Sequence, residues 1–179
     1  TFLHSKGKPH SDEEKNFDID ARFGHKGYGY SATVNMDKDS KLIRKTVVTS
    51  AEILDFQSTD DVLIGDEKKV FADRGYDPAR KLLEIKHPNT EFIIMHKRKR
   101  GKKGEPTPNL NVFKQEVNNI CARIRARVEH AFGIMMFVFG FQRLRYVGLE
   151  RVTAKFNSLV IAYNFARLGF LLRNQGITA

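Results

Sequence analysis

The feature that most constrains the fold is a long amphipathic segment in the second half of the chain, from about Asn111 to Phe139. Apolar residues recur in it at the spacing of one helix face, at Val117, Ile120, Ile124, Val128, Ala131 and Met135. This pattern predicts one long helix that packs one side against a hydrophobic core.

Glu129 lies off this apolar stripe, on a flank of the helix that also carries Arg125 one turn earlier. Arg123, Arg127 and His130 point toward the opposite flank. An isolated Arg-x-x-x-Glu pair is usually an exposed salt bridge that contributes little. A chemical role for Glu129 therefore needs support from elsewhere in the chain.

Composition narrows the class of protein. The chain has 179 residues and is 41% hydrophobic, enough for one core, so we expect a single domain over residues 1–179. Its 31 Lys and Arg against 21 Asp and Glu give a net charge of +10, which favours a polyanionic partner, either nucleic acid or an anionic membrane surface.

The single cysteine, Cys121, excludes an internal disulfide and a cysteine-based zinc site, and it indicates a reducing compartment such as the cytoplasm. We expect Cys121 to be a buried residue of the long helix.

Two further patterns bear on location and completeness. No basic region followed by an apolar run opens the chain, and the most apolar segment, 156–172, is interrupted by Asn157, Asn164 and Arg167, so we expect a soluble protein. The chain begins abruptly on Thr1-Phe-Leu, as though inside a strand, which predicts a fragment.

The first half of the chain predicts mainly strands. Residues 5–20 are polar without periodicity and predict an exposed loop. Alternating residues over 27–35 and 42–49, separated by a polar turn, predict a β-hairpin. Ser50 is a candidate cap for a helix over 51–63.

The next part predicts a strand, helix and strand. An apolar strand begins at Lys69 and places Asp73 at its carboxyl end, Pro78 starts a helix that continues to Lys86, and 91–95 is a second strand. This order is typical of neighbouring parallel strands in an α/β fold. A last helix over 149–172 should bring Val152, Phe156, Leu159, Val160, Tyr163 and Leu168 to the core.

Residues 96–108 form a basic segment that ends in two prolines and cannot pack in a core. Its cations are Lys97, Arg98, Lys99, Arg100, Lys102 and Lys103. The segment is either a solvated flexible loop or a set of contacts to phosphates, and the residues alone do not choose between these.

Asp73 and Glu129 are the two acids whose settings could bring them together over the carboxyl edge of a sheet. Carboxylate oxygens suit hard divalent cations, and a pair of such ions can clamp the attacking and leaving oxygens of an in-line displacement. His25, His87, His96 and His130 lack the spacing of a zinc site and are interpreted as surface or packing residues.

The strings Val70-Phe-Ala-Asp-Arg-Gly-Tyr-Asp77 and Arg123-Ile-Arg-Ala-Arg-Val-Glu-His130 resemble the catalytic region of bacterial insertion-sequence DDE transposases. Phe139-Gly and Arg143-Leu-Arg-Tyr-Val-Gly-Leu149 continue the likeness, which extends from about Phe23 to Leu172. The resemblance implies an α/β fold with a ribonuclease H-like mixed sheet flanked by helices. It also implies three acids that hold two Mg²⁺ or Mn²⁺ ions, with Asp73 as the second acid and Glu129 as the third.

The first acid of that family lies upstream, commonly in an Asp-Ala-Thr string. We expect Thr1 to be the Thr of that string and the first aspartate to precede the chain. Asp18 and Asp20 are the nearest internal carboxylates, but they lie outside any expected strand and are poor substitutes.

A second departure concerns the helix of Glu129. The family has a Tyr seven residues before the Glu, an Arg four before it and a Lys seven after it, whereas this chain has Ala122, Arg125 and Met136. Arg125 is thus the matching support residue, and Arg143 or Arg145 could supply the DNA contact expected of the Lys.

The resemblance implies phosphoryl transfer on double-stranded DNA, first cleavage at the element end and then attack of the freed 3′-hydroxyl on target DNA. It further implies a homo-oligomer on DNA and a location at the bacterial nucleoid. Two alternatives remain: a catalytically inactive DNA-binding protein derived from such an enzyme, and a hydrolytic nuclease without strand transfer.

Overall fold

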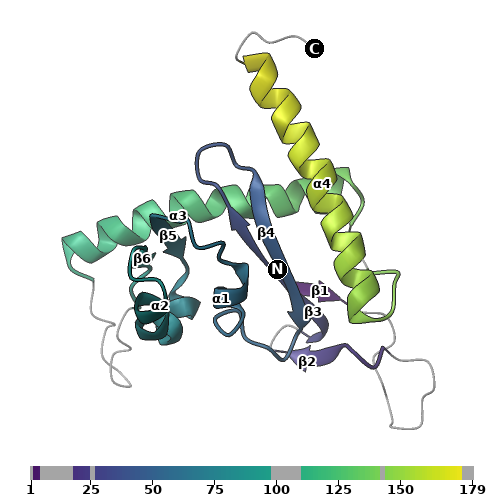
Figure 1. Cartoon of the computed structure of the whole chain (residues 1–179), viewed down its shortest axis with the longest axis horizontal. Coiled ribbons are helices and arrows are strands. Elements are labelled where there is room, and N and C mark those ends of the chain that lie inside the picture. The colour runs from purple at the N-terminus through teal and green to yellow at the C-terminus, as the bar shows by residue number, and fades with distance from the viewer. Residues whose placement is uncertain (1, 5–17, 25–26, 98–109, 142–143, 175–179) are drawn as a thin grey trace, which may run out of the picture. The chain divides into compact units, whose positions relative to one another are not determined.

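The computed structural model describes residues 2–4, 18–24, 27–97, 110–141 and 144–174. It is a mixed α/β structure whose contacts divide the chain into two compact units (Figure 1). Unit 1 comprises Thr1–Leu63 and Val128–Ala179, and unit 2 comprises Ile64–Arg127.

Unit 1 is built on a sheet of four antiparallel strands. These strands are β1 (Phe2–His4), β2 (Arg22–Gly24), β3 (Gly27–Met36) and β4 (Ile43–Ser50). Strand β3 pairs with each of the other three, and its long ladder with β4 runs from Tyr30 opposite Ser50 to Met36 opposite Ile43. The expected β-hairpin is therefore confirmed, and the opening residues form a strand as their apolar character predicted.

Helix α4 (Leu149–Asn174) packs against β4 in unit 1 (Figure 1). Asn164 fixes its position, because the side-chain amide accepts a hydrogen bond from Ile43 N at 2.9 Å and donates one to Ile43 O at 2.8 Å. Phe156 is fully buried and packs against the rings of Phe132 and Phe141. These contacts place the core of unit 1 between the sheet and the C-terminal helix.

Unit 2 contains a parallel pair of strands, β5 (Lys69–Ala72) and β6 (Glu91–Ile94), as their order in the sequence predicted. Between them lie a 3-10 helix, η1 (Arg74–Ala79), and helix α2 (Arg80–Lys86).

The long helix is also confirmed as α3 (Val112–Gly133), followed by a π-helical turn, η2 (Ile134–Val138). Cys121 is buried on α3 at 2% exposure, as expected.

Two expectations about helices are wrong. Residues 51–58 form turns, and only Thr59–Val62 are helical, as α1. A local hydrogen bond competes with a helix there, since Leu54 N donates to the Gln57 side chain at 2.9 Å. The Asp55 side chain is engaged by β3, because it accepts from the Ser31 hydroxyl at 2.8 Å. Leu168 is 43% exposed; it follows Asn164 and Arg167, which donate to Ile43 O at the start of β4 and to Ser40 O in the preceding turn.

Among the described residues, no helix combines the length and the apolarity needed to cross a bilayer.

Candidate active site

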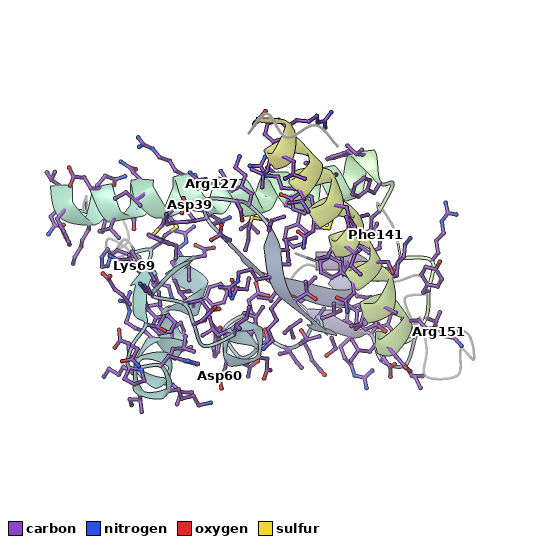
Figure 2. The ribbon with its side chains drawn as sticks, turned by 45° about the horizontal axis from the view of Figure 1, so that its top comes forward. Asp39, Asp60, Lys69, Arg127, Phe141 and Arg151 are labelled. Atoms are coloured by element: carbon purple, nitrogen blue, oxygen red, sulfur yellow. The ribbon has the colours of Figure 1, made fainter. Side chains whose placement is uncertain are left out.

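Asp73 stands where β5 ends, the position that the sequence predicted. Lys69, labelled in Figure 2, begins the strand, and η1 follows Asp73 directly. One carboxylate oxygen of Asp73 accepts a hydrogen bond from Arg74 N at 2.7 Å, so the side chain caps the 3-10 helix. Asp73 is thereby held at the carboxyl edge of the parallel pair, where α/β proteins gather their functional groups.

Arg125 reaches Asp73 from helix α3. Its Nη1 lies 3.0 Å from Asp73 Oδ2, with the arginine side chain 47% exposed and the carboxylate 34% exposed. The ion pair and the Arg74 amide engage different oxygens of Asp73, so together they fix its orientation. Arg125 was expected to orient Glu129 or to contact phosphate, which stays a prediction; the ion pair that the structure shows is with Asp73.

Asn118 holds α3 beside the end of β6, and its role was not predicted. His96 N donates to Asn118 Oδ1 at 2.7 Å, and Asn118 Nδ2 donates to His96 O at 3.2 Å. One turn nearer to Arg125, the Cys121 thiol lies 3.6 Å from Ile93 O. This two-point amide contact positions the helix that carries Arg125, and an Asn inside a helix on the flank of Arg125 was the only sequence signal for it.

The charge of Asp73 affects the Cys121 thiol on α3. Burial, and then the negative charge of Asp73, raise the pKa of the Cys121 thiol. Cys121 therefore remains a neutral packing residue, as its burial on α3 predicted.

Glu129 is exposed on α3, one turn after Arg125 along the helix. It belongs to unit 1, whereas Asp73 and Arg125 belong to unit 2. A metal site shared by Asp73 and Glu129 therefore stays a prediction. Among the described residues, no group of three or more His, Cys, Asp or Glu is clustered as a metal site.

The donor set is nevertheless suitable for a hard cation. Asp73 is a partly exposed carboxylate at a strand end, and Mg²⁺ commonly takes one or two protein carboxylates and fills its remaining positions with water and phosphate oxygens. Its two oxygens already have an amide and a guanidinium as partners, so an ion at Asp73 would share the carboxylate with Arg125.

The predicted DNA-contacting residues fall in different parts of the chain. Lys97 is exposed just after β6, and Arg145 is exposed between η2 and α4. The remaining members lie outside the described residues: Arg98, Lys99, Arg100, Lys102, Lys103 and Arg143.

Asp18 was expected to lie in an exposed loop, and the structure buries it. It is fully buried, and its carboxylate accepts hydrogen bonds from Tyr30 Oη at 2.7 Å and from Gly148 N at 3.2 Å. Tyr28 Oη donates to the backbone carbonyl of Asp18. The Asp18 carboxylate thus joins the sheet to the start of α4, and no hydrophobic pattern in the sequence indicated this burial.

No solved structure matches this chain. A family model described as a transposase DDE domain matches residues 4–165, which includes β5 with Asp73 and α3 with Arg125 and Glu129. The match spans most of the chain, and so the chain belongs to the DDE transposase family.

Proposed function

We propose that this chain carries the catalytic carboxylates of an insertion-sequence transposase, which cleaves phosphodiester bonds at the element ends and joins them to target DNA. The observation that carries the proposal is the ion pair between Asp73, at the end of β5, and Arg125 of helix α3. Glu129 follows Arg125 by one turn on the same helix. The proposal includes a ribonuclease H-like fold and a homo-oligomer on double-stranded DNA.

The chemistry requires charge stabilisation at the phosphate and correct placement of the nucleophile. Two Mg²⁺ or Mn²⁺ ions, when bound, would stabilise the attacking and leaving oxygens of an in-line displacement. Asp73 and Glu129 are the proposed ligands of these ions.

Arg125 acts on the carboxylate itself. Its guanidinium orients Asp73 through the 3.0 Å contact and offsets part of the negative charge when phosphate approaches. Lys97, the other cations of the 96–108 segment, and Arg143 with Arg145 would hold the DNA backbone without reading its sequence.

The test is cleavage of element-end DNA by the protein. We expect Asp73→Asn and Glu129→Gln each to lower cleavage with Mg²⁺ by at least about a hundredfold, the scale on which misplacing reacting groups acts. Both variants should still bind the DNA, because neither substitution removes a positively charged side chain.

Two matched controls use exposed acids, one on η1, which Asp73 caps, and one on α3, which carries Glu129. Asp77→Asn lies on η1, where Asp77 pairs with Arg80 at 3.3 Å, and Glu116→Gln lies on α3. Both controls should cleave normally. Normal cleavage by the Asp73 or Glu129 variant would remove that residue from the proposed site.

The second candidate is a DNA-binding protein that has lost cleavage. Ala122 and Met136, which stand where the resembled family has Tyr and Lys, favour this alternative. It predicts a wild-type protein that binds element-end DNA but does not cleave it with Mg²⁺ or Mn²⁺.

A further inference from the structure

A small cavity lies in unit 1 where the chain passes from the π-helical turn to α4. Its volume is about 280 Å³, and the described residues that line it are Phe139, Gly140, Phe141, Arg145, Tyr146 and Lys155. This volume is at the lower limit of ordinary ligand sites, so it suits one small ring system and not an extended molecule.

Aromatic rings form the apolar part of the cavity. Phe141 is buried and packs on Phe156 of α4, with ring centroids 6.3 Å apart; Figure 2 shows it beside that helix. Phe139 packs against the same core, while Tyr146 is 47% exposed at the cavity. One ring is thus fixed by the core and another is free to stack on a planar ligand.

The backbone also shapes this site. Phe139 N donates to Ile134 O at 3.2 Å, which closes the π-helical turn, and such turns recur at functional sites. Gly140 follows with a φ of 70°, a backbone conformation that residues other than glycine rarely adopt. This turn directs Phe139 and Phe141 to one cavity although they flank the same glycine.

Two cations complete the lining. Arg145 is exposed and Lys155 is half-buried, and within the described part of the chain neither has an acidic partner. Aromatic faces next to unpaired cations are the combination that binds nucleotides, because the ring stacks on the base and the cation contacts the phosphate.

We propose that this cavity binds one unpaired nucleotide of a DNA strand, with its base on Tyr146 and its phosphate at Arg145 and Lys155. The inference rests on the proposed function only in taking DNA as the polyanion. A paired base could not enter, since its faces are covered by its neighbours in the duplex.

The test compares three duplexes of equal length by fluorescence anisotropy, in buffer with EDTA so that no cleavage occurs. One is fully paired, one carries a single unpaired 2-aminopurine, and one carries an unpaired abasic sugar at the same place. We expect the 179-residue chain to bind the unpaired base about 5- to 150-fold more tightly than either other duplex, the range for one base–aromatic stack.

Variants assign this preference to the cavity. Tyr146→Ala should abolish it, and Tyr146→Phe should retain it because the ring remains. Phe165→Ala, which removes a 70% exposed ring elsewhere on α4, should also retain it. Arg145→Gln and Lys155→Gln should weaken binding to all three duplexes.

Several results would overturn the inference. Equal affinity for the unpaired base and the abasic sugar would show recognition of a bent backbone, and an unchanged preference in Tyr146→Ala would place the base elsewhere. If the wild-type chain shows no preference for the unpaired base while its cleavage depends on Asp73, this inference alone is contradicted. Retained preference with cleavage that does not need Asp73 contradicts only the proposed function, and a chain that binds no DNA contradicts both.

Discussion

Asp18 is the residue of unit 1 whose buried carboxylate accepts hydrogen bonds from three different residues. A fully buried carboxylate is costly unless its oxygens are satisfied, and Tyr30, Gly148 and Asp20 N provide donors for it. The tyrosine hydroxyl responds to the same environment. Burial first, and then the hydrogen bond and charge of Asp18, raise the pKa of Tyr30 well above its ordinary value.

We expect Tyr30→Phe to lower the free energy of unfolding at pH 7 by about 1–3 kcal/mol, because it removes a donor from a buried carboxylate. Tyr163→Phe is the matched control. Tyr163 is also buried, but its hydroxyl donates at 3.0 Å to a neutral acceptor, Lys41 O, and not to a carboxylate, so the loss should be smaller. Urea denaturation measures both, and equal losses would contradict a special role for Asp18.

The raised pKa of Tyr30 also predicts a pH dependence. A group whose pKa is higher in the folded state stabilises fully below its unfolded pKa, about 10 for tyrosine, and loses that contribution as the pH rises further. Unfolding free energy should therefore fall above about pH 10, and less steeply in Tyr30→Phe than in the wild type. A curve of equal slope in both would show that Tyr30 is not the group responsible.

At the scale of elements, the beginning of α4 depends on two acids from a distant part of the chain. Leu149 N donates to Asp20 Oδ2 at 2.9 Å, next to the Gly148–Asp18 bond, and Gly148 has a φ of 95° that places it outside the helix. The first amides of a helix lack partners within it, so these carboxylates act as its cap.

Asp20→Ala should therefore lower the free energy of unfolding by about 1 kcal/mol, and Asp20→Asn by less because it keeps an acceptor oxygen. Asp39→Ala, which removes an exposed acid paired with Lys38, is the control and should change stability little. Thermal unfolding of the three variants makes the comparison. Equal stability of Asp20→Ala and the wild type would contradict the capping role.

Which elements could be predicted depended on how regular their patterns were. Helices α3 and α4 and strands β5 and β6 follow clear periodicity or strand order, so their positions and the end of β5 at Asp73 were predictable. The turns over 51–58 were not, because side-chain hydrogen bonds such as that of Gln57 override a helical pattern. The contacts of Asn118 and Asp18 also join residues far apart in sequence, which no local pattern encodes.

At the scale of the whole molecule, the net charge of +10 is the property most relevant to DNA. Replacing the six cations between Lys97 and Lys103 with Gln should weaken DNA binding and flatten the plot of log K against log salt, by about 0.9 for each phosphate that the protein no longer neutralises. Titrations at several salt concentrations measure the slope. A slope equal to that of the wild type would show that this segment is only a solvated loop.

The division of unit 1 also has a consequence for biosynthesis. Its sheet comes from residues before unit 2 and α4 from residues after it, and the hydrogen bond between Asp18 and Gly148 joins positions 130 residues apart. During translation the sheet strands emerge first, yet the helix that covers them is made only after all of unit 2. The apolar face of the nascent sheet must therefore wait, uncovered by its own helix, while the ribosome completes the inserted segment.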